Sequence, residues 1–117
     1  MMTTFQSPTL AIEQFLNAEE AWFWFVRSEK ARAERAKASE TKSIFDRPCD
    51  PDDVFRWVKQ LYEDGSLATG HLVVMGQYGF LDRLPDPDAD EEVVDHIMWT
   101  DAFDRLEPML IDKGVVA

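Results

Sequence analysis

Apolar residues recur at helical spacing along the first third of the chain. Ser7-Pro8 pairs an N-cap residue with a proline at the first helical position. The apolar positions that follow keep to one side of a 3.6-residue period. We therefore predict one long helix over residues 8–38, with Asn17 and Glu20 offering an alternative start through a capping box. The apolar side of this helix consists of Ile12, Phe15, Leu16, Trp22, Phe23, Val26 and Ala33.

A second helix is predicted over residues 51–64 by the string DPDD at positions 50–53. Aspartate is a favoured N-cap, proline is tolerated at the first helical position, and further acids interact well with the positive end of the helix dipole. Gly65 supplies a residue that readily adopts the left-handed conformation at a helix end. The buried side of this helix is predicted to hold Val54, Trp57, Val58 and Leu61.

The second half of the chain predicts two more elements. Residues 67–80 form a short apolar segment whose period does not separate a helix from a strand, and we favour a helix. From about residue 91, apolar residues recur every four positions as far as Gly114, which predicts a final helix. This helix should kink or restart at Pro108, because proline removes a backbone donor. Its core side comprises Val94, Met98, Ala102, Leu106 and Leu110, with Trp99 and Phe103 beside them.

These elements predict an all-α fold, a compact bundle of three to five helices with one long aromatic N-terminal helix. The length fits a single domain over residues 1–117, with a flexible N-terminus at 1–7. Connecting loops are expected at 39–49, with Ile44 and Phe45 packed on the body, and at 82–90. The apolar content of 45% is enough to build a core without a metal or cofactor. The predicted core contains Ile12, Phe15, Leu16, Trp22, Phe23, Val26, Val54, Trp57, Val58, Leu61, Met98, Phe103 and Leu106.

Cysteine use and hydropathy indicate a compartment. Cys49 is the single cysteine of the chain and cannot form an internal disulfide. The first ten residues lack the charged and apolar regions of a secretory signal, and no apolar stretch is long enough to span a membrane. A reducing, cytoplasmic location is therefore expected.

Negative charge is concentrated in the second part of the chain. The net charge is −11, and residues 1–49 hold seven acids and seven Lys/Arg, whereas residues 50–117 hold sixteen acids and five Lys/Arg. The densest run covers 23 positions, in which Arg83 is the only base before Arg105 follows. Because like charges at this density repel and cost stability, a use for the field is plausible. The acids of this run are Asp82, Asp86, Asp88, Asp90, Glu91, Glu92, Asp95, Asp101 and Asp104.

A concentrated negative field steers a protein toward surfaces lined by Lys and Arg. Such surfaces are richest in nucleic-acid-binding proteins, which neutralise phosphates. We therefore expect an acidic interaction module that binds a basic surface of a nucleic-acid-processing protein. It would act as an inhibitor in the nucleic-acid groove, as DNA mimics and some anti-CRISPR proteins do, an analogy of charge and size. No direct contact with nucleic acid or membrane is expected.

The string Trp-Phe-Trp-Phe at residues 22–25 spans the whole circumference of a helix. One interpretation is a central helix that other helices cover on every side. The other is a partner or homodimer interface anchored by Trp24 and Phe25, which would join the nine acids in the partner-binding surface.

Two alternative functions fit the pattern less well. Helix 51–64, the turn at Gly65 and a helix at 67–80 outline a helix-turn-helix transcriptional regulator, with the basic residues of 27–37 tracking phosphates. Its recognition helix would contain no Lys or Arg, and the isoelectric point of about 4.4 opposes attraction to phosphate. The other alternative is a non-catalytic subunit that joins a larger assembly through its aromatic helix.

No catalytic, metal or cofactor site is expected. Cys49, His71 and His96 are isolated in sequence and lack the short spacing of a metal site. Asp86, Asp88 and Asp90 match the first ligand positions of a calcium loop. Position 6, which needs glycine, is Glu91, and position 12, which needs an acid, is Ile97.

Four strings resemble a small bacterial family without an assigned activity. They are EQFLNAEEAWFWF, RPCDPDDV, DRLEPMLIDKGVV and the pattern G-x-L-x-x-x-H-L-x-V-x-x-x-Y-G over residues 65–79. The resemblance spans nearly the whole chain and implies a free-standing, single-domain bacterial protein. It implies no catalytic residue or ligand.

Overall fold

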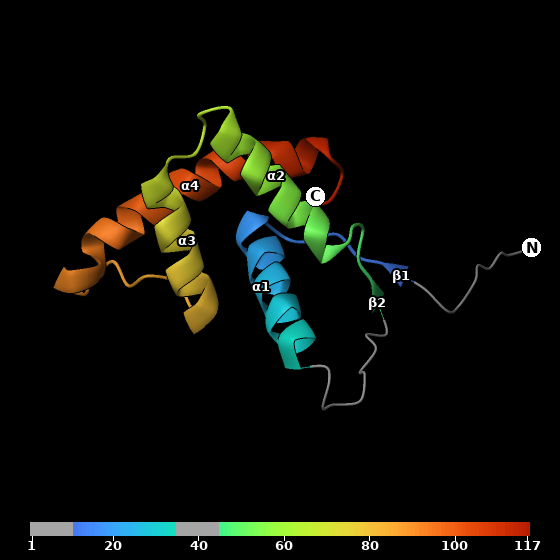
Figure 1. The fold of residues 1–117 in the computed structure, drawn as a ribbon, viewed down its shortest axis with the longest axis horizontal. Helices are drawn as coiled ribbons and strands as arrows, with labels where there is room; N and C mark the ends of the chain where they lie inside the picture. The colour runs from blue at the N-terminus through green and yellow to red at the C-terminus, as the bar shows by residue number, and fades with distance from the viewer. Residues whose placement is uncertain (1–10, 35–44) are drawn as a thin grey trace, which may run out of the picture.

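A computed structural model describes residues 11–34 and 45–117 of the chain (Figure 1). Four α-helices occur in this part: α1 (Ala18–Glu34), α2 (Pro51–Glu63), α3 (Thr69–Leu81) and α4 (Val93–Asp112). A short 3-10 helix, η2 (Asp90–Glu92), precedes α4, and two-residue strands β1 (Ala11–Ile12) and β2 (Phe45–Asp46) pair in parallel. The predicted all-α bundle of three to five helices is confirmed.

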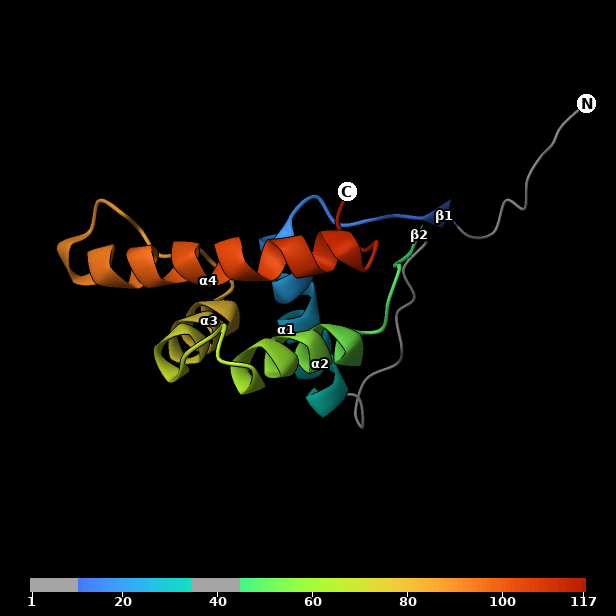
Figure 2. The ribbon, with the colours of Figure 1, turned by 90° about the horizontal axis from the view of Figure 1, so that it is seen from above.

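The helices surround α1. Figure 2 shows α4 along one side of the molecule, α2 and α3 on the other, and α1 crossing between them. Accordingly α1 contacts α2, α3 and α4, and α3 packs along α4. The ring of Trp99 lies at the centre of the core, within 4.4 Å of the Phe103 ring and 5.6 Å of the Phe23 ring, measured between centroids.

A capping box starts α1 ten residues later than the predicted start at residue 8. The side chain of Asn17 accepts a hydrogen bond from the N–H of Glu20 (2.8 Å), and the Glu20 carboxylate accepts one from the N–H of Leu16 (2.6 Å). These bonds satisfy donors that a helix start leaves free. The alternative start is therefore correct, whereas the proposed cap at Ser7-Pro8 and residues 35–38 lie outside the described residues.

The residues just before α1 are extended because their backbone pairs with the far end of the chain. The N–H of Phe15 donates to the carbonyl of Val115 (2.9 Å), and the N–H of Ala117 donates to the carbonyl of Phe15 (3.3 Å). Phe15 is buried, but Ile12 and Leu16 are exposed, Leu16 by 81%. Their predicted place in the core is wrong, since they were assigned on a helical period that this segment does not have.

The aromatic run of α1 is enclosed, as the central-helix interpretation predicts. The buried stripe of α1 runs through Ala18, Ala21, Trp22 and Phe25, while Phe23, Trp24 and Val26 are partly buried against it. The Trp24 ring packs 5.1 Å from the Phe15 ring, and Phe25 is only 9% exposed. Phe25 is therefore almost fully covered within the chain, whereas Trp24 is covered only in part.

The predicted second helix is confirmed. The Asp53 carboxylate accepts a hydrogen bond from the N–H of Asp50 (3.0 Å) at its start, and Gly65 adopts a φ of +90° after its end. Along α2, Val54, Val58 and Leu61 are buried and Trp57 is partly buried. The segment at 67–80, whose period does not separate a helix from a strand, is helical and forms most of α3. Ile44, and the side chain of Phe45, lie outside what the structure describes.

The final helix does not restart at proline. Helix α4 continues four residues past Pro108 to Asp112. Pro108 and Asp104 are both exposed, so the carbonyl that loses its donor lies on the side open to water. Among the described residues, no helix is both long enough and apolar enough to cross a bilayer.

Candidate partner-binding surface

The acid-rich segment forms one end of the molecule. Figures 1 and 2 show the loop after α3, η2 and the first turns of α4 together at this end, with α4 extending beyond α3. Asp82 closes α3 in the left-handed conformation (φ 61°), which aspartate tolerates better than most residues. The acids of the loop and of η2 thus share one end with the start of α4.

An ion pair closes the acidic loop. The Arg83 guanidinium donates two hydrogen bonds to the Glu92 carboxylate (2.9 and 2.7 Å), and Glu92 also accepts one from the N–H of Asp86 (2.8 Å). The Arg83 pairing and the bond from Asp86 lower the pKa of Glu92 to about 2. Arg83 also lies over the Tyr78 ring, 5.3 Å from its centroid. The loop is therefore fixed to α3 and to η2.

A second polar contact joins α3 to α4 beneath the loop. The hydroxyl of Tyr78 donates a 2.7 Å hydrogen bond to the Asp95 carboxylate. This bond, together with burial, raises the pKa of Tyr78 to about 12. The carboxylate of Asp95 thus makes a contact inside the fold, and Asp95 is partly buried.

Two more of the nine predicted acids have partners within the described residues. Asp82 pairs with Arg27 of α1 (3.0 Å). Asp101 lies 2.7 Å from the Nε2 of His71 and 3.0 Å from Arg105, and the hydrogen bonds from His71 and then Arg105 lower its pKa. With Glu92 and Asp95, four of the nine acids therefore serve contacts inside the protein.

The other five acids make no ion pair with any described residue. They are all exposed, and Asp86 uses one carboxylate oxygen to accept a hydrogen bond from the N–H of Asp88 (2.9 Å). This turn directs the loop without neutralising either charge. Within the described ranges, no three His, Cys, Asp or Glu side chains are grouped to hold a metal ion. We define the acidic end as Asp86, Asp88, Asp90 and Glu91, whereas Asp104 lies further along α4 beside Thr100 and Asp101.

Apolar side chains lie among these acids, which the sequence analysis did not anticipate. Leu84, Val94 and Ile97 are exposed, Val94 by 68%. Val94 was predicted to face the core because apolar residues recur every four positions there. On a helix of 3.6 residues per turn, such a repeat drifts by about 40° at each step, so the positions at its start turn away from the core. Counting back from buried Trp99 instead turns Asp95 inward and Val94 and Ile97 outward. That count could have found them.

The acidic face continues along α4. Ile97, Thr100, Asp101 and Asp104 border a shallow hollow of about 320 Å³ together with His96. Carboxylates and an apolar side chain thus border the same depression. The hollow lies on α4, which follows directly after the loop and η2.

Of the three residues considered for nucleophilic or metal chemistry, Cys49 and His71 have structural surroundings, whereas the buried Nδ1 of His96 has no hydrogen-bond partner among the described residues. Burial, followed by the charges of Asp53 and Asp50, raises the pKa of Cys49 to about 11, which leaves little thiolate at neutral pH. His71 accepts a hydrogen bond from the N–H of Ala68 through Nδ1 (2.9 Å), so its Nε2 carries the proton shared with Asp101. His71 therefore caps α3.

The helices of the helix-turn-helix outline are present, but α1 packs against both of them. The exposed side chains of α3 include Val73, Gln77 and Phe80, with no Lys or Arg among them. Positive charge to meet phosphate is thus missing from the helix that would read bases.

Comparison with protein-family models, with curated proteins and with solved structures gave no match for this chain. The resemblance to a small bacterial family therefore stays a prediction.

Proposed function

We propose that this protein is an acidic interaction module whose acidic end binds a Lys/Arg-rich surface of a nucleic-acid-processing protein. The partner surface is one that nucleic acid would otherwise occupy, so that binding inhibits the partner. The observation that carries the proposal is the Arg83–Glu92 ion pair, which holds the loop while the four carboxylates of the acidic end keep no ion-pair partner among the described residues.

The fixed loop supports recognition as well as attraction. Arg83 and Glu92 hold the two ends of the loop together, and the N–H of Asp86 adds a third contact. Acids presented on a fixed backbone lose less conformational freedom on binding than acids on a free tail. The acidic end is thus better suited to a defined basic surface than to unspecific attraction.

The apolar neighbours favour a protein as the partner. Leu84, Val94 and Ile97 offer hydrophobic contact beside the carboxylates. Protein interfaces combine such apolar contact with charge complementarity, which mainly governs the association rate and the choice of partner. Direct binding of nucleic acid is disfavoured by the same charges.

The test is affinity capture from a bacterial lysate at low and at high salt, followed by addition of duplex DNA to the captured complex. We expect a basic nucleic-acid-binding protein to be retained at low salt, lost at high salt and displaced by the duplex. The protein alone should not retard the duplex in a gel.

Two variants of equal charge decide where the partner binds. In the end variant, Asp86→Asn, Asp88→Asn, Asp90→Asn and Glu91→Gln remove four charges from the acidic end. In the control variant, Glu13→Gln, Glu34→Gln, Glu63→Gln and Asp112→Asn remove four exposed acids elsewhere. Capture should be lost in the end variant and retained in the control. Equal capture by both variants, or capture that salt does not weaken, would overturn the proposal.

A further inference from the structure

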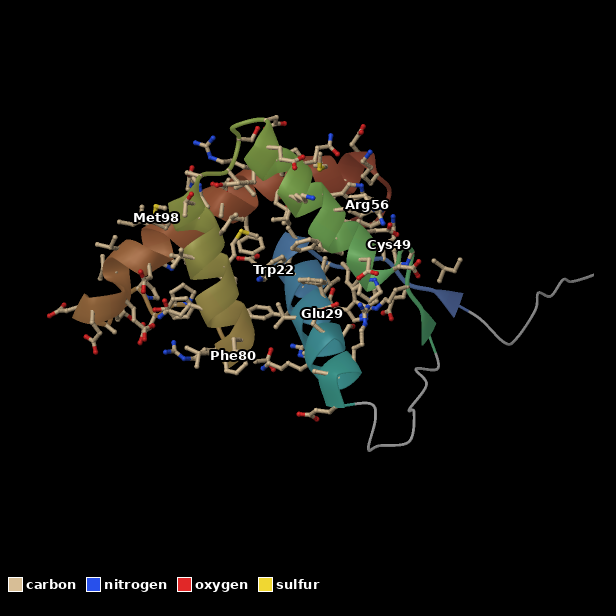
Figure 3. All side chains as sticks on the ribbon, viewed as in Figure 1. Trp22, Glu29, Cys49, Arg56, Phe80 and Met98 are labelled. Atoms are coloured by element: carbon tan, nitrogen blue, oxygen red, sulfur yellow. The ribbon has the colours of Figure 1, made fainter. Side chains whose placement is uncertain are left out.

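A second surface, on the side opposite α4, is apolar and open. Between α2 and α3 lies a groove of about 220 Å³, with Trp22 of α1 at its floor. Figure 3 shows Trp22 between the ribbons of α3 and α2. The groove walls are Phe55, Val58 and Tyr62 from α2 and Leu72 and Gly76 from α3.

Gly76 keeps this groove open. A Cβ placed at position 76 would meet no atom within 4 Å, so no packing among residues 11–34 and 45–117 requires glycine there. Glycine in the interior of a helix nevertheless weakens that helix. Position 79, one turn later, differs, because a Cβ there would come 2.8 Å from the Trp22 indole nitrogen. The space beside Gly76 is therefore open, whereas the space beside Gly79 is filled by Trp22.

Large side chains extend the apolar surface around the groove. Phe55 is 51% exposed, Tyr62 43% and Phe80, near the end of α3, 67%. Helix α3 carries no Asp, Glu, Lys or Arg at all. Among the residues that the structure describes, the only charged side chain lining the groove is Lys59, whose ammonium lies 4.0 Å from Glu63.

The size and charge of this surface argue against a second copy of the chain as its occupant. With about 200 Å² for an aromatic side chain, the exposed parts of the three rings amount to roughly 300 Å². A standard interface needs about 800 Å² from each partner. Dimerisation would also bring two chains of charge −11 together.

We propose that the α2–α3 groove binds an amphipathic helix of another protein, with apolar residues on one face and Lys or Arg on the other. Apolar residues at positions i, i+3, i+4 and i+7 of a helix fill a groove between two helices. The basic face suits the surroundings, because the segment 50–64 carries five acids against Arg56 and Lys59. Asp52, Asp53 and Glu63 are in ion pairs, which leaves Asp50 and Asp64 without one among the described residues. This inference does not depend on the acidic end.

The probe is a synthetic peptide of about 14 residues with Leu at one helical face and Lys elsewhere. Its affinity is measured by fluorescence anisotropy of a label on the peptide, and its place by the chemical shifts of the Trp22 indole N–H and the Gly76 amide. We expect both resonances to shift on binding. The same peptide with Glu in place of Lys should bind about tenfold more weakly or worse.

Gly76→Leu fills the groove from within and should weaken peptide binding by about tenfold or more without lowering the thermal midpoint. Gln77→Leu adds the same side chain at the next exposed position of α3, outside the groove, and should leave affinity unchanged. The end variant, which removes four charges from the acidic end, should bind the peptide within about threefold of wild type. Its substitutions lie outside the groove and change only the long-range electrostatic attraction to the peptide.

Equal binding by the Gly76→Leu and Gln77→Leu variants would overturn the proposal. So would a dimer in sedimentation equilibrium that Gly76→Leu dissociates, because the occupant would then be a second copy. Loss of peptide binding in the end variant alone would place the peptide on the acidic end instead. None of these outcomes decides the proposed function of the acidic end, which the capture experiment tests separately.

Discussion

Trp22 lies so close to Gly79 that a Cβ at position 79 would come within 2.8 Å of its indole nitrogen. The same nitrogen donates a 2.8 Å hydrogen bond to the main-chain carbonyl of Met75, one turn earlier on α3. A buried indole N–H needs such a partner, and only a residue without a side chain at 79 lets the ring reach it. Gly79 thus sets the distance between α1 and α3.

We predict that Gly79→Ala lowers the free energy of unfolding by about 1–3 kcal/mol, because the added methyl overpacks the contact with Trp22. The matched control is Gly76→Ala, where a Cβ meets nothing. It should raise the free energy of unfolding by about 0.5–1 kcal/mol through helix propensity. Urea unfolding measures both. Equal effects of the two substitutions would contradict the close approach.

Glu107 caps α1 from a different helix. Its carboxylate accepts a 2.9 Å hydrogen bond from the N–H of Ala18, the first residue of α1. Glu107→Ala should therefore lower the free energy of unfolding by about 1 kcal/mol, as loss of an N-cap does. Asp104→Ala, one turn earlier on α4 and exposed, should change it by less than about 0.5 kcal/mol. A thermal midpoint that Glu107→Ala leaves unchanged would count against this cap.

The Arg83–Glu92 pair predicts a loss of stability in acid. The pKa of Glu92 is about 2 in the folded chain against an ordinary value of 4.5. The unfolded chain therefore takes up the proton first, and the stabilisation is present above pH 4.5 and is lost as the pH falls toward 2. In Glu92→Gln this contribution is missing, so its urea midpoint should approach that of wild type as the pH falls.

Arg83→Gln provides the complementary variant for this experiment. It removes the partner that contributes most to the lowered pKa of Glu92. Its stability should also converge on that of wild type below pH 4.5. Curves for wild type and Glu92→Gln that run parallel between pH 2 and 5 would show that the pair does not act in this way.

Cys49 should react slowly. Burial and two nearby aspartates raise its pKa to about 11 from 9.0, which reduces the thiolate at pH 8 by roughly a hundredfold. Alkylation by iodoacetamide should be correspondingly slower in the folded chain than in urea. The folded rate should rise steeply toward pH 11. Equal rates for the folded and unfolded chains would exclude a shifted thiol.

Local sequence patterns predicted the elements whose ends are determined locally. The DPDD string marks the start of α2, and Gly65 follows its end with the positive φ expected of it. The apolar segment at 67–80 also has a local start signal, since the His71 side chain accepts a hydrogen bond from the N–H of Ala68, the N-cap residue of α3. The start of α1 also has a local signal, the capping box of Asn17 and Glu20, but the sequence does not show that Phe15 before it is extended and bonds to Val115.

The candidate surface was predicted only in outline. The run from Asp82 to Asp104 was recognisable by composition, but which acids keep their charge free depends on distant partners. Arg27 lies 55 positions before the aspartate it pairs with, and His71 lies 30 positions before Asp101. Such pairs arise only once the helices are packed. The apolar groove left no trace in any periodic pattern, because it lies between two helices.

The pairing beside Phe15 has a consequence for how the chain folds. The side chain of Gln14 donates to the carbonyl of Gly114, 100 positions later, alongside the backbone bonds of Phe15. During synthesis, the residues of all four described helices are added to the chain before Gly114 and Val115, the C-terminal partners in this contact. Contacts of such long sequence separation slow folding, since a large loop must close before they form. The ring of Phe15 can pack on Trp24 early, but the backbone N–H and carbonyl of Phe15 stay without these partners until Val115 and Ala117 have been added to the chain.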